Sequence, residues 1–370
     1  MICRIEDLKK ISTILLTAVD SSDISKITDN LELKVENEIL NLSVTNGEYF
    51  VRTKLPIYEN IDFHATVNAN VFLKLITKIT TETVEFKIDN NNLLIIGNGE
   101  YKIPMIYDGT ELMTLPEIKI DNVTNKFKIK SEILKSILFY NSKELSKRNV
   151  VSNPVQKLYY IDNEGAITFT SGACVNTFKL EKPVKILLSQ KVVSLFKLFD
   201  DEDIDFSIGH DQIAGTSNIQ TKVSFSSEFL SISAILPSND VLIGTVPVKA
   251  IRDRAFNTYT SSVVLNRIET LQAIDRLMIF YGGSAMFYAR FKFSSNGVKI
   301  STLDNEISES VNINSSSGLD NEYDAILDLN DLRIVLHSYD ESHVTMNFGD
   351  NQAVVLIKPN IYSVIPEVRI

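Results

Sequence analysis

Apolar and polar residues alternate in three similar segments of this 370-residue chain, at residues 84–88, 204–208 and 344–348. Strict alternation over five residues is typical of a β-strand with one buried face. A short amphipathic helix is predicted before each strand, at residues 71–79, 191–199 and 331–338. In the first of these helices Phe72, Leu75 and Ile76 share one face at helical spacing. The chain therefore repeats a helix–strand pattern three times.

A longer amphipathic segment opens each repeat, and we predict helices at residues 5–19, 131–140 and 266–280. Leu8, Ile11 and Leu15 form the apolar stripe of the first helix. Paired strands follow, joined by turns such as Asn163-Glu164-Gly165, whose composition favours hairpins. Chance similarity among short strands does not account for the whole order of elements recurring three times. The sequence predicts an α+β fold with three copies of one domain, at residues 1–123, 124–248 and 249–370.

Composition narrows the chemistry that this fold can carry. The chain has 37 Lys and Arg against 47 Asp and Glu, so its net charge is 37 − 47 = −10. An acidic average argues against coating nucleic acid with the whole surface but leaves room for a local basic face. Two cysteines, Cys3 and Cys174, and four histidines without metal-ligand spacing predict neither a disulfide framework nor a metal site. No cofactor is expected.

Basic residues gather in one stretch despite the acidic average. Residues 126–148 contain seven Lys or Arg and two Glu, a local charge of 7 − 2 = +5. Lys74 and Lys78, four residues apart, lie opposite the apolar stripe of their predicted helix. Positive helix faces of this kind suit phosphate groups, although a single helical lysine is as readily an ordinary solvated residue.

Four short segments carry a family resemblance. Residues 30–33 read Asn-Leu-Glu-Leu, residues 169–173 read Phe-Thr-Ser-Gly-Ala, and residues 364–370 read Val-Ile-Pro-Glu-Val-Arg-Ile. Together with residues 229–237 and the threefold repeat, they resemble the β subunit of bacterial DNA polymerase III, the sliding clamp, over the whole chain. Ala173-Cys174 replaces the family's His-Arg pair, and Glu367 is an extra residue. The chain is therefore identified as a divergent member, of cellular or phage origin.

This resemblance implies a DNA sliding clamp, which is a non-catalytic processivity factor of DNA replication. In the family, two chains form a homodimeric ring around double-stranded DNA. Lys and Arg on the inner helices then contact phosphates without reading the base sequence. The implied partners are DNA polymerase, the clamp loader and other proteins with a clamp-binding motif. The implied location is the cytoplasm, at the nucleoid of a cell or within a phage host, with no membrane contact.

Three sets of site residues follow from the resemblance. Those expected to face DNA are Lys9, Lys10, Lys74, Lys78, Lys135, Lys143, Lys147, Arg148, Lys191, Lys197, Arg276 and Arg333. A hydrophobic groove for partner peptides is expected at Thr170, Gly172, Val175, Leu230, Ile235, Leu236, Met286, Val364, Ile365, Pro366 and Val368. The dimer interface is expected where Tyr101, Ile103 and Met105 of one chain meet Met278, Ile279 and Phe280 of the other.

Two other classes of protein compete with this interpretation. An enzyme is disfavoured because the sequence contains no phosphate-binding loop and no nucleophile elbow, and His210-Asp211 is expected in a surface turn. A β-rich repeat protein that makes only protein contacts would share the repeat and the acidity. It would not need basic residues on the helix faces opposite the apolar stripes, so charge reversal at those positions distinguishes the two.

Overall fold

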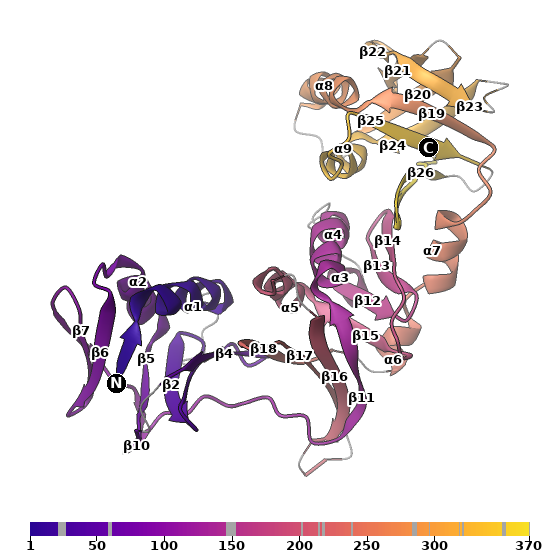
Figure 1. Cartoon of the computed structure of the whole chain (residues 1–370). Coiled ribbons are helices and arrows are strands. Elements are labelled where there is room, and N and C mark those ends of the chain that lie inside the picture. Colours follow the sequence, from indigo (N-terminus) through magenta and orange to yellow (C-terminus); the bar gives the residue numbers. More distant parts are fainter. Residues whose placement is uncertain are drawn as a thin grey trace. The chain divides into compact units, whose positions relative to one another are not determined.

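The computed structural model describes the chain except residues 21–26, 58–60, 146–152, 201–202, 214, 217–218, 238–239, 283–286, 296, 318, 320–321, 350–352 and 370. Within the described residues, one order of elements occurs six times: a strand, a helix and three further strands (Figure 1). Two such half-units make up each repeat predicted from the sequence. The fold class is therefore confirmed, and the repeating element is half as long as the sequence pattern suggested.

The first repeat holds two half-units and a short connection. The first comprises β1 (Ile2–Arg4), α1 (Ile5–Ala18), β2 (Asn30–Glu36), β3 (Ile39–Thr45) and β4 (Tyr49–Pro56). The second comprises β5 (His64–Asn68), α2 (Ala69–Lys78), β6 (Thr83–Asp89), β7 (Asn92–Ile96) and β8 (Glu100–Pro104). The connection begins with the two-residue strands β9 (Tyr107–Asp108) and β10 (Glu111–Leu112).

The second repeat has less regular helices. Its first half-unit comprises β11 (Val123–Lys130), α3 (Ser131–Ser136), a π-helical turn (Ile137–Asn141), α4 (Ser142–Leu145), a 3₁₀ turn (Pro154–Lys157), β12 (Leu158–Asp162), β13 (Gly165–Phe169) and β14 (Ala173–Thr177). Its second comprises β15 (Lys185–Ser189), α5 (Gln190–Ser194), a 3₁₀ turn (Leu195–Leu198), β16 (Asp203–Gln212), β17 (Ile219–Ser226) and β18 (Leu230–Ile235). The helices predicted at residues 131–140 and 191–199 are confirmed in place, but each changes its helical type part-way.

Two helices that the sequence did not predict, α6 (Asp240–Gly244) and α7 (Val248–Ala255), precede the third repeat. Its first half-unit comprises β19 (Ser261–Asn266), α8 (Arg267–Met278), a 3₁₀ turn (Ile279–Tyr281), β20 (Tyr288–Ser294), β21 (Gly297–Thr302) and β22 (Ser308–Val311). Strand β23 (Ile313–Ser317) follows. The last half-unit comprises β24 (Tyr323–Asp328), α9 (Leu329–His337), β25 (His343–Phe348), β26 (Ala353–Lys358) and β27 (Ile361–Pro366).

The two half-units of a repeat exchange their first strands. In the first repeat β1 pairs with β6, and β5 pairs with β2, so each helix connects two sheets. The apolar stripe of α1 explains its place, because Leu8 and Leu15 are fully buried between the sheets. Helix α2 begins at an N-cap in which the Asn68 side chain accepts a hydrogen bond from the Val71 amide at 3.0 Å.

By its contacts the chain divides into two compact units. Unit 1 comprises Met1–Leu134 and Lys191–Ser238, and unit 2 comprises Lys135–Gln190 and Asn239–Ile370. Unit 1 contains the four-stranded sheet β1-β6-β7-β8 and the eight-stranded sheet β11-β16-β17-β18-β4-β3-β2-β5. Unit 2 contains the nine-stranded sheet β15-β12-β13-β14-β27-β26-β25-β19-β23 and the four-stranded sheet β22-β21-β20-β24.

Each large sheet crosses a domain boundary predicted from the sequence. In unit 1, β18 pairs with β4 from Leu230 opposite Thr53, and in unit 2, β14 pairs with β27 from Ala173 opposite Val364. The middle repeat therefore shares one sheet with the first repeat and another with the last. The predicted three-domain division remains a prediction, because contacts follow the sheets rather than the repeats.

Candidate nucleic-acid and partner surfaces

Helices α1 and α2 carry the basic residues of unit 1 that the sequence predicted to face DNA. The two helices pack side by side (Figure 1). Lys10, Lys74 and Lys78 are exposed, and Lys9 is half-buried. None of these four lysines takes part in an ion pair within the part of the chain that the structure describes. Their charge is therefore available to a phosphate.

The basic stretch at residues 126–148 is divided between a strand and a helix. Lys126, Lys128 and Lys130 lie on the exposed face of β11, and alternate with buried side chains of its other face. These three lysines precede the helix predicted at residues 131–140 and lie on a strand. Lys135 and Lys143 do lie on helical segments, and the Lys143 ammonium is 5.6 Å from the centre of the Phe139 ring. The predicted DNA contacts Lys147 and Arg148 lie outside the described residues.

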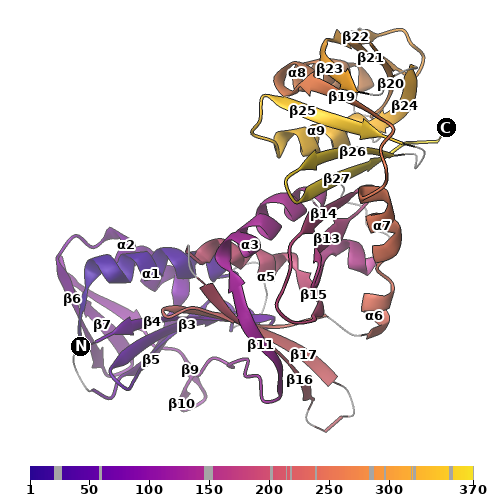
Figure 2. The same cartoon turned by 45° about the vertical axis from the view of Figure 1, so that its right-hand side comes forward.

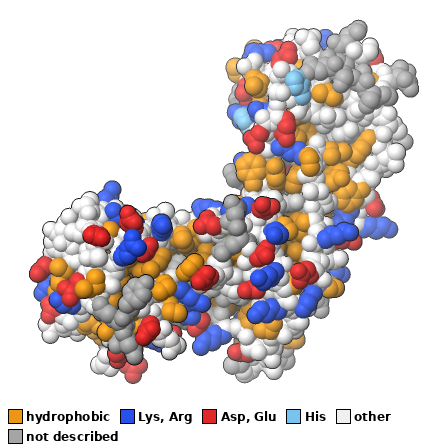
Figure 3. All heavy atoms as spheres, in the orientation of Figure 1, with side chains coloured by type: hydrophobic (Ala, Val, Ile, Leu, Met, Phe, Trp, Pro, Cys, Tyr) orange, Lys and Arg blue, Asp and Glu red, His pale blue; other side chains and the backbone are white. Residues whose placement is uncertain are grey.

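Three other predicted DNA-facing cations have acidic partners. The Arg276 guanidinium donates two hydrogen bonds to the Glu309 carboxylate, both 2.8 Å long. These bonds hold the pKa of Glu309 below its ordinary value. Arg333 pairs with Asp275 at 2.6 Å, and Lys191 pairs with Asp20 at 2.7 Å. Lys197 is exposed on the 3₁₀ turn after α5. On the face shown in Figure 3, Lys and Arg are interspersed with Asp and Glu.

Most of the predicted peptide-groove residues of unit 2 meet where β14 pairs with β27. Gly172 precedes β14, and a Cβ at this position would lie 2.3 Å from the Val364 carbonyl oxygen, so only glycine fits. The Thr170 hydroxyl donates to the Glu144 carboxylate at 2.8 Å. Val175, Val364 and Ile365 are buried, whereas Pro366 and Val368 are half-buried.

Helix α7 covers one face of this strand pair (Figure 2). Ile251 and Ala255 of α7, together with Val246, belong to the same buried apolar cluster as Val175 and Val364. Arg252 of the helix forms ion pairs with Asp162, at the end of β12, at 2.7 Å and with Glu164, in the following turn, at 2.8 Å. Burial, together with the neighbouring Asp162, raises the pKa of Tyr160 in this cluster to about 12. Sequence reasoning missed α7 because its eight residues lack an extended apolar stripe.

The remaining predicted groove residues belong to unit 1 or lie outside the described residues. Leu230, Ile235 and Leu236 belong to β18 and the residue after it, in unit 1. Ile235 packs there against a cluster of Phe50, Leu115 and Ile118. That these three residues share a groove with the Val364 group remains a prediction, because the two groups belong to different units. Met286 lies outside the described residues.

Two sheet edges are relevant to the predicted dimer interface. Strand β8, which carries Tyr101 and Ile103, ends the four-stranded sheet of unit 1, and Met105 follows it. Ile103 is buried and Tyr101 half-buried, so one side of the strand packs inward. In unit 2, Ile279 and Phe280 are 73% and 61% exposed just after α8, while Met278 packs against the core.

Strand β22 is the edge that sequence reasoning missed. It ends the four-stranded sheet of unit 2 and packs beside α8, the helix that precedes Ile279. Its residues Ser308–Val311 read Ser-Glu-Ser-Val and contain one apolar side chain, so hydrophobic patterning gave no signal. Among the described strands, β8 pairs only with β7 and β22 only with β21. Both therefore present unpaired backbone groups.

The fold is that of the bacterial DNA polymerase sliding clamps, and the first third of the chain matches their sequence family. Residues 1–117 match the family described as "DNA polymerase III beta subunit, N-terminal domain". The resemblance drawn from the sequence is thus confirmed. A comparison with curated proteins gives no match.

Solved structures match the whole chain at low sequence identity. The DNA polymerase sliding clamp from Bacillus subtilis is 16% identical with a TM-score of 0.78, and the match covers 100% of this chain and 98% of that one. The DNA polymerase III subunit beta from Pseudomonas aeruginosa is 14% identical with a TM-score of 0.80, over 100% and 99%. The beta chain from Streptococcus pneumoniae is 15% identical with a TM-score of 0.78, over 100% and 99%.

No helix of the described chain is both long and apolar enough to cross a membrane. The described residues also contain no group of three or more His, Cys, Asp or Glu arranged to hold a metal ion.

Proposed function

We propose that this protein is a DNA sliding clamp, a non-catalytic subunit that encircles duplex DNA as a homodimer of three-domain chains. The observation that carries the proposal is the arrangement of sheets. Two junctions, β4 with β18 and β14 with β27, already join neighbouring repeats into continuous sheets. Strands β8 and β22 each end a four-stranded sheet, and pairing them between two chains would close a ring by the same kind of junction.

The basic helices give the ring its sequence-independent hold on DNA. Exposed lysines that have no acidic partner among the described residues, such as Lys74 and Lys78, contact phosphates and release counterions. They read no base edges, so the ring slides. In the third repeat Arg276 and Arg333 are neutralised by Glu309 and Asp275, so this repeat contributes less to the attraction. The negative charge of the whole chain opposes binding of DNA elsewhere on the surface.

The strand pair β14–β27 and the residues after it form the proposed docking region for partner peptides. Half-buried Pro366 and Val368 offer apolar contacts beside the polar Thr170. The partners we propose are the replicative polymerase, the clamp loader and other proteins with a clamp-binding motif. A role in DNA replication would place the protein in the cytoplasm, either at the nucleoid of a cell or within a phage host.

The proposed ring is tested first by its mass. Light scattering should give about twice 41.6 kDa, and a monomer or a trimer would contradict the proposal. Replacing both Ile279 and Phe280 by Asp should shift the mass towards 41.6 kDa, because two carboxylates would then be buried against the apolar residues of β8 in the other chain. The same change at Ile219, which is 68% exposed in β17, is the matched control and should leave the dimer intact.

DNA binding is tested separately with a short linear duplex, onto which a ring can thread. Charge reversal to Glu at Lys9, Lys74 and Lys78 should weaken binding strongly. It should also flatten the salt dependence by about 0.9 in slope for each phosphate that a lysine no longer neutralises. Reversal at Lys87, Lys185 and Lys299, which are exposed on strands, is the matched control. Equal binding by both triple variants would favour a β-repeat protein that makes only protein contacts.

A further inference from the structure

Unit 1 contains a cavity to which the proposed clamp function assigns no ligand of its own. Its volume is about 1120 Å³, and it lies between α1, the end of β4, the 3₁₀ turn after α5 and the turn before β18. A volume of this size exceeds what most small molecules fill and accommodates several residues of an extended peptide. None of the residues proposed for the partner-peptide groove lines it.

The cavity has an aliphatic lining with one aromatic residue at its opening. Ile11 and Ile14 come from α1, and Leu55 follows from the end of β4. Phe229, which is 52% exposed, contributes a large apolar side chain at the turn before β18. Its carbonyl oxygen accepts a hydrogen bond from the Lys54 amide at 2.9 Å, so the two sides of the opening are fixed together. An apolar ligand would thus enter a preformed site.

Helix α1 has one buried apolar face, and Ile14 adds an apolar side chain beside it. Leu8 and Leu15 are fully buried in the core of unit 1. Lys10, Ile14 and Thr17, spaced at three and four residues, turn towards the cavity instead. Ile14 is half-buried among polar residues of this side of the helix. Ile14 is therefore available for contact with a ligand.

Cations dominate the charge around this lining. Lys10, Lys54 and Lys197 line the cavity, and no described ion pair involves any of the three. Arg4 also lines it but is paired with Glu6 at 3.7 Å. A ligand with negative charges beside apolar groups would complement such a site.

The ligand chemistry favours a peptide over a nucleic acid. The lining is aliphatic except for Phe229, so a run of bases would find one stacking surface only. Asp7 and Asp200 also line the cavity, and they would repel a continuous row of phosphates. Both carboxylates can instead accept hydrogen bonds from the backbone amides of a peptide.

We propose that this cavity binds a short acidic peptide segment of a partner protein, with aliphatic side chains on Ile11, Ile14 and Leu55 and carboxylates at Lys10, Lys54 and Lys197. The cavity belongs to unit 1, whereas the β14–β27 region belongs to unit 2. Lys10 and Lys197 are also among the residues proposed to face DNA. Peptide and DNA would therefore compete for these two lysines, whereas Lys54 would serve the peptide alone.

The experiment uses a fluorescein-labelled decapeptide of alternating Asp and Leu, with fluorescence polarisation as the measurement. We expect saturable binding to the full-length protein and a loss of about tenfold in affinity for Lys54→Glu. Lys128→Glu, an equal charge change on the exposed face of β11, is the matched control and should bind normally. A decapeptide with Ser in place of Leu should bind weakly, because serine cannot fill the aliphatic lining.

Three outcomes would overturn the proposal. The first is that the peptide does not bind saturably, and the second is that Lys54→Glu and Lys128→Glu bind the peptide equally well. The third is that a single-stranded oligonucleotide binds in a way that depends on Lys54, whereas the peptide does not. Hydrogen exchange gives an independent check on location, since the peptide should slow exchange in α1 and at residues 54–57. Protection confined to unit 2 would also contradict the proposal. An unchanged urea midpoint for Lys54→Glu shows that the variant is folded.

Discussion

Two segments connect neighbouring repeats, and each packs on a shared sheet with a different secondary structure. Residues 113–122 join the first repeat to the second within unit 1, and the segment with α6 and α7 joins the second to the third within unit 2. Each crosses a sheet at a junction between repeats. The first connection is extended and has two buried apolar anchors, Leu115 and Ile118. The second is helical and shares a larger apolar cluster.

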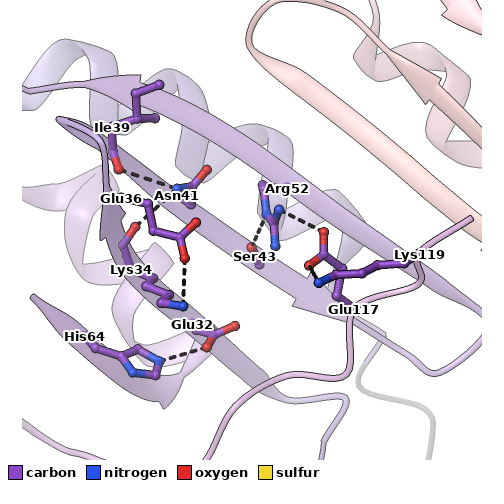
Figure 4. Close-up of polar contacts among 10 residues, drawn as sticks. All are labelled: Glu32, Lys34, Glu36, Ile39, Asn41, Ser43, Arg52, His64, Glu117 and Lys119. Carbon is purple, nitrogen blue, oxygen red and sulfur yellow. Dashed lines mark hydrogen bonds and ion pairs between the residues drawn. The ribbon is translucent and has the colours of Figure 1, made fainter. Parts of the chain in front are cut away.

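The extended connection relies on side chains to satisfy its polar groups. The Asp211 carboxylate accepts hydrogen bonds from the Asp121 and Asn122 amides, at 3.3 and 2.9 Å. Arg52, on the same face of β4 as Phe50, pairs with Glu117 at 2.9 Å, as Figure 4 shows. Helix α7 satisfies its interior amides within itself, so its side chains are free to pack. A helical connection can therefore bury more apolar surface for the same number of residues.

The largest expected effect is the loss of the buried ion pair that holds α7. Arg252→Ala leaves the Asp162 carboxylate, 6% exposed, with hydrogen bonds from the Tyr160 hydroxyl and the Glu164 amide but without its cation, and should lower the free energy of unfolding by about 3 kcal/mol. Arg52→Ala, the equivalent change in the extended connection, should cost about 0–1 kcal/mol, because its pair is one-quarter to one-third exposed. Urea denaturation measures both, and equal losses would remove the distinction between the two connections.

Truncation of one apolar anchor in each connection compares their cores directly. Ile251 and Ile118 are each 8% exposed, so they form a matched pair. Ile251→Ala should cost about 2–3 kcal/mol, since closely packed neighbours leave a cavity that cannot collapse. Ile118→Ala should cost less, about 2 kcal/mol, because the extended segment can relax onto the sheet and fill part of the space. A larger loss for Ile118 in the same urea titration would contradict this account.

Acid should loosen the extended connection before the helical one. Burial opposes ionisation of Asp211, but hydrogen bonds from Lys222 and from the Asn122 and Asp121 amides outweigh it and lower its pKa. Because the pKa of Asp211 is lower in the folded than in the unfolded protein, its ionised form stabilises the fold. This stability is fully present above the pKa of an unfolded Asp, about 3.9, and is lost as the pH falls through the lower pKa of the folded protein.

The control for this pH effect is Asp211→Asn, which keeps the shape and removes the charge. It should cost about 1–2 kcal/mol at pH 7 and reduce the dependence of unit 1 stability on pH below 5. Hydrogen exchange at residues 119–122, compared between pH 7 and pH 4, is the measurement. An unchanged pH dependence in the variant would show that Asp211 is not the group responsible.

The smallest effect is expected at the ion pair of the extended connection. Glu117→Gln removes the charge that faces Arg52 and Lys119 and should cost about 0.5 kcal/mol at low salt. The difference from the unaltered protein should vanish near 1 M salt, where screening is short-ranged. A difference that persists at high salt would mean that Glu117 contributes packing rather than charge.

Local patterning was sufficient to predict the repeated helices and strands, but not α6, α7 or β22. The strands predicted at residues 84–88, 204–208 and 344–348 are confirmed as β6, β16 and β25. The helices beginning near residues 5, 71 and 266 are confirmed as α1, α2 and α8. Each depends on a period of two or 3.6 residues that is complete within one segment, so neighbouring residues alone specify it. The threefold repeat was visible for the same reason.

The candidate sites were less predictable, because they depend on residues far apart in the sequence. The seven-cation stretch was recognised, but the sequence did not show that Lys126, Lys128 and Lys130 lie on a strand. Nor did it show that Arg276 meets Glu309, 33 residues away. The cavity beside α1 is formed by segments from both ends of unit 1, including Phe229. No single segment carries a signal for such a site.

The sequence by itself determined the α+β class, the repeat, the buried faces of the helices and the resemblance to the sliding clamps. Tertiary structure alone decided which strands exchange partners, that β8 and β22 end their sheets, and which junction α7 covers. The physical reason is that strand pairing uses backbone groups, which every sequence offers equally. The choice of partner then depends on side chains that meet only after the chain has folded.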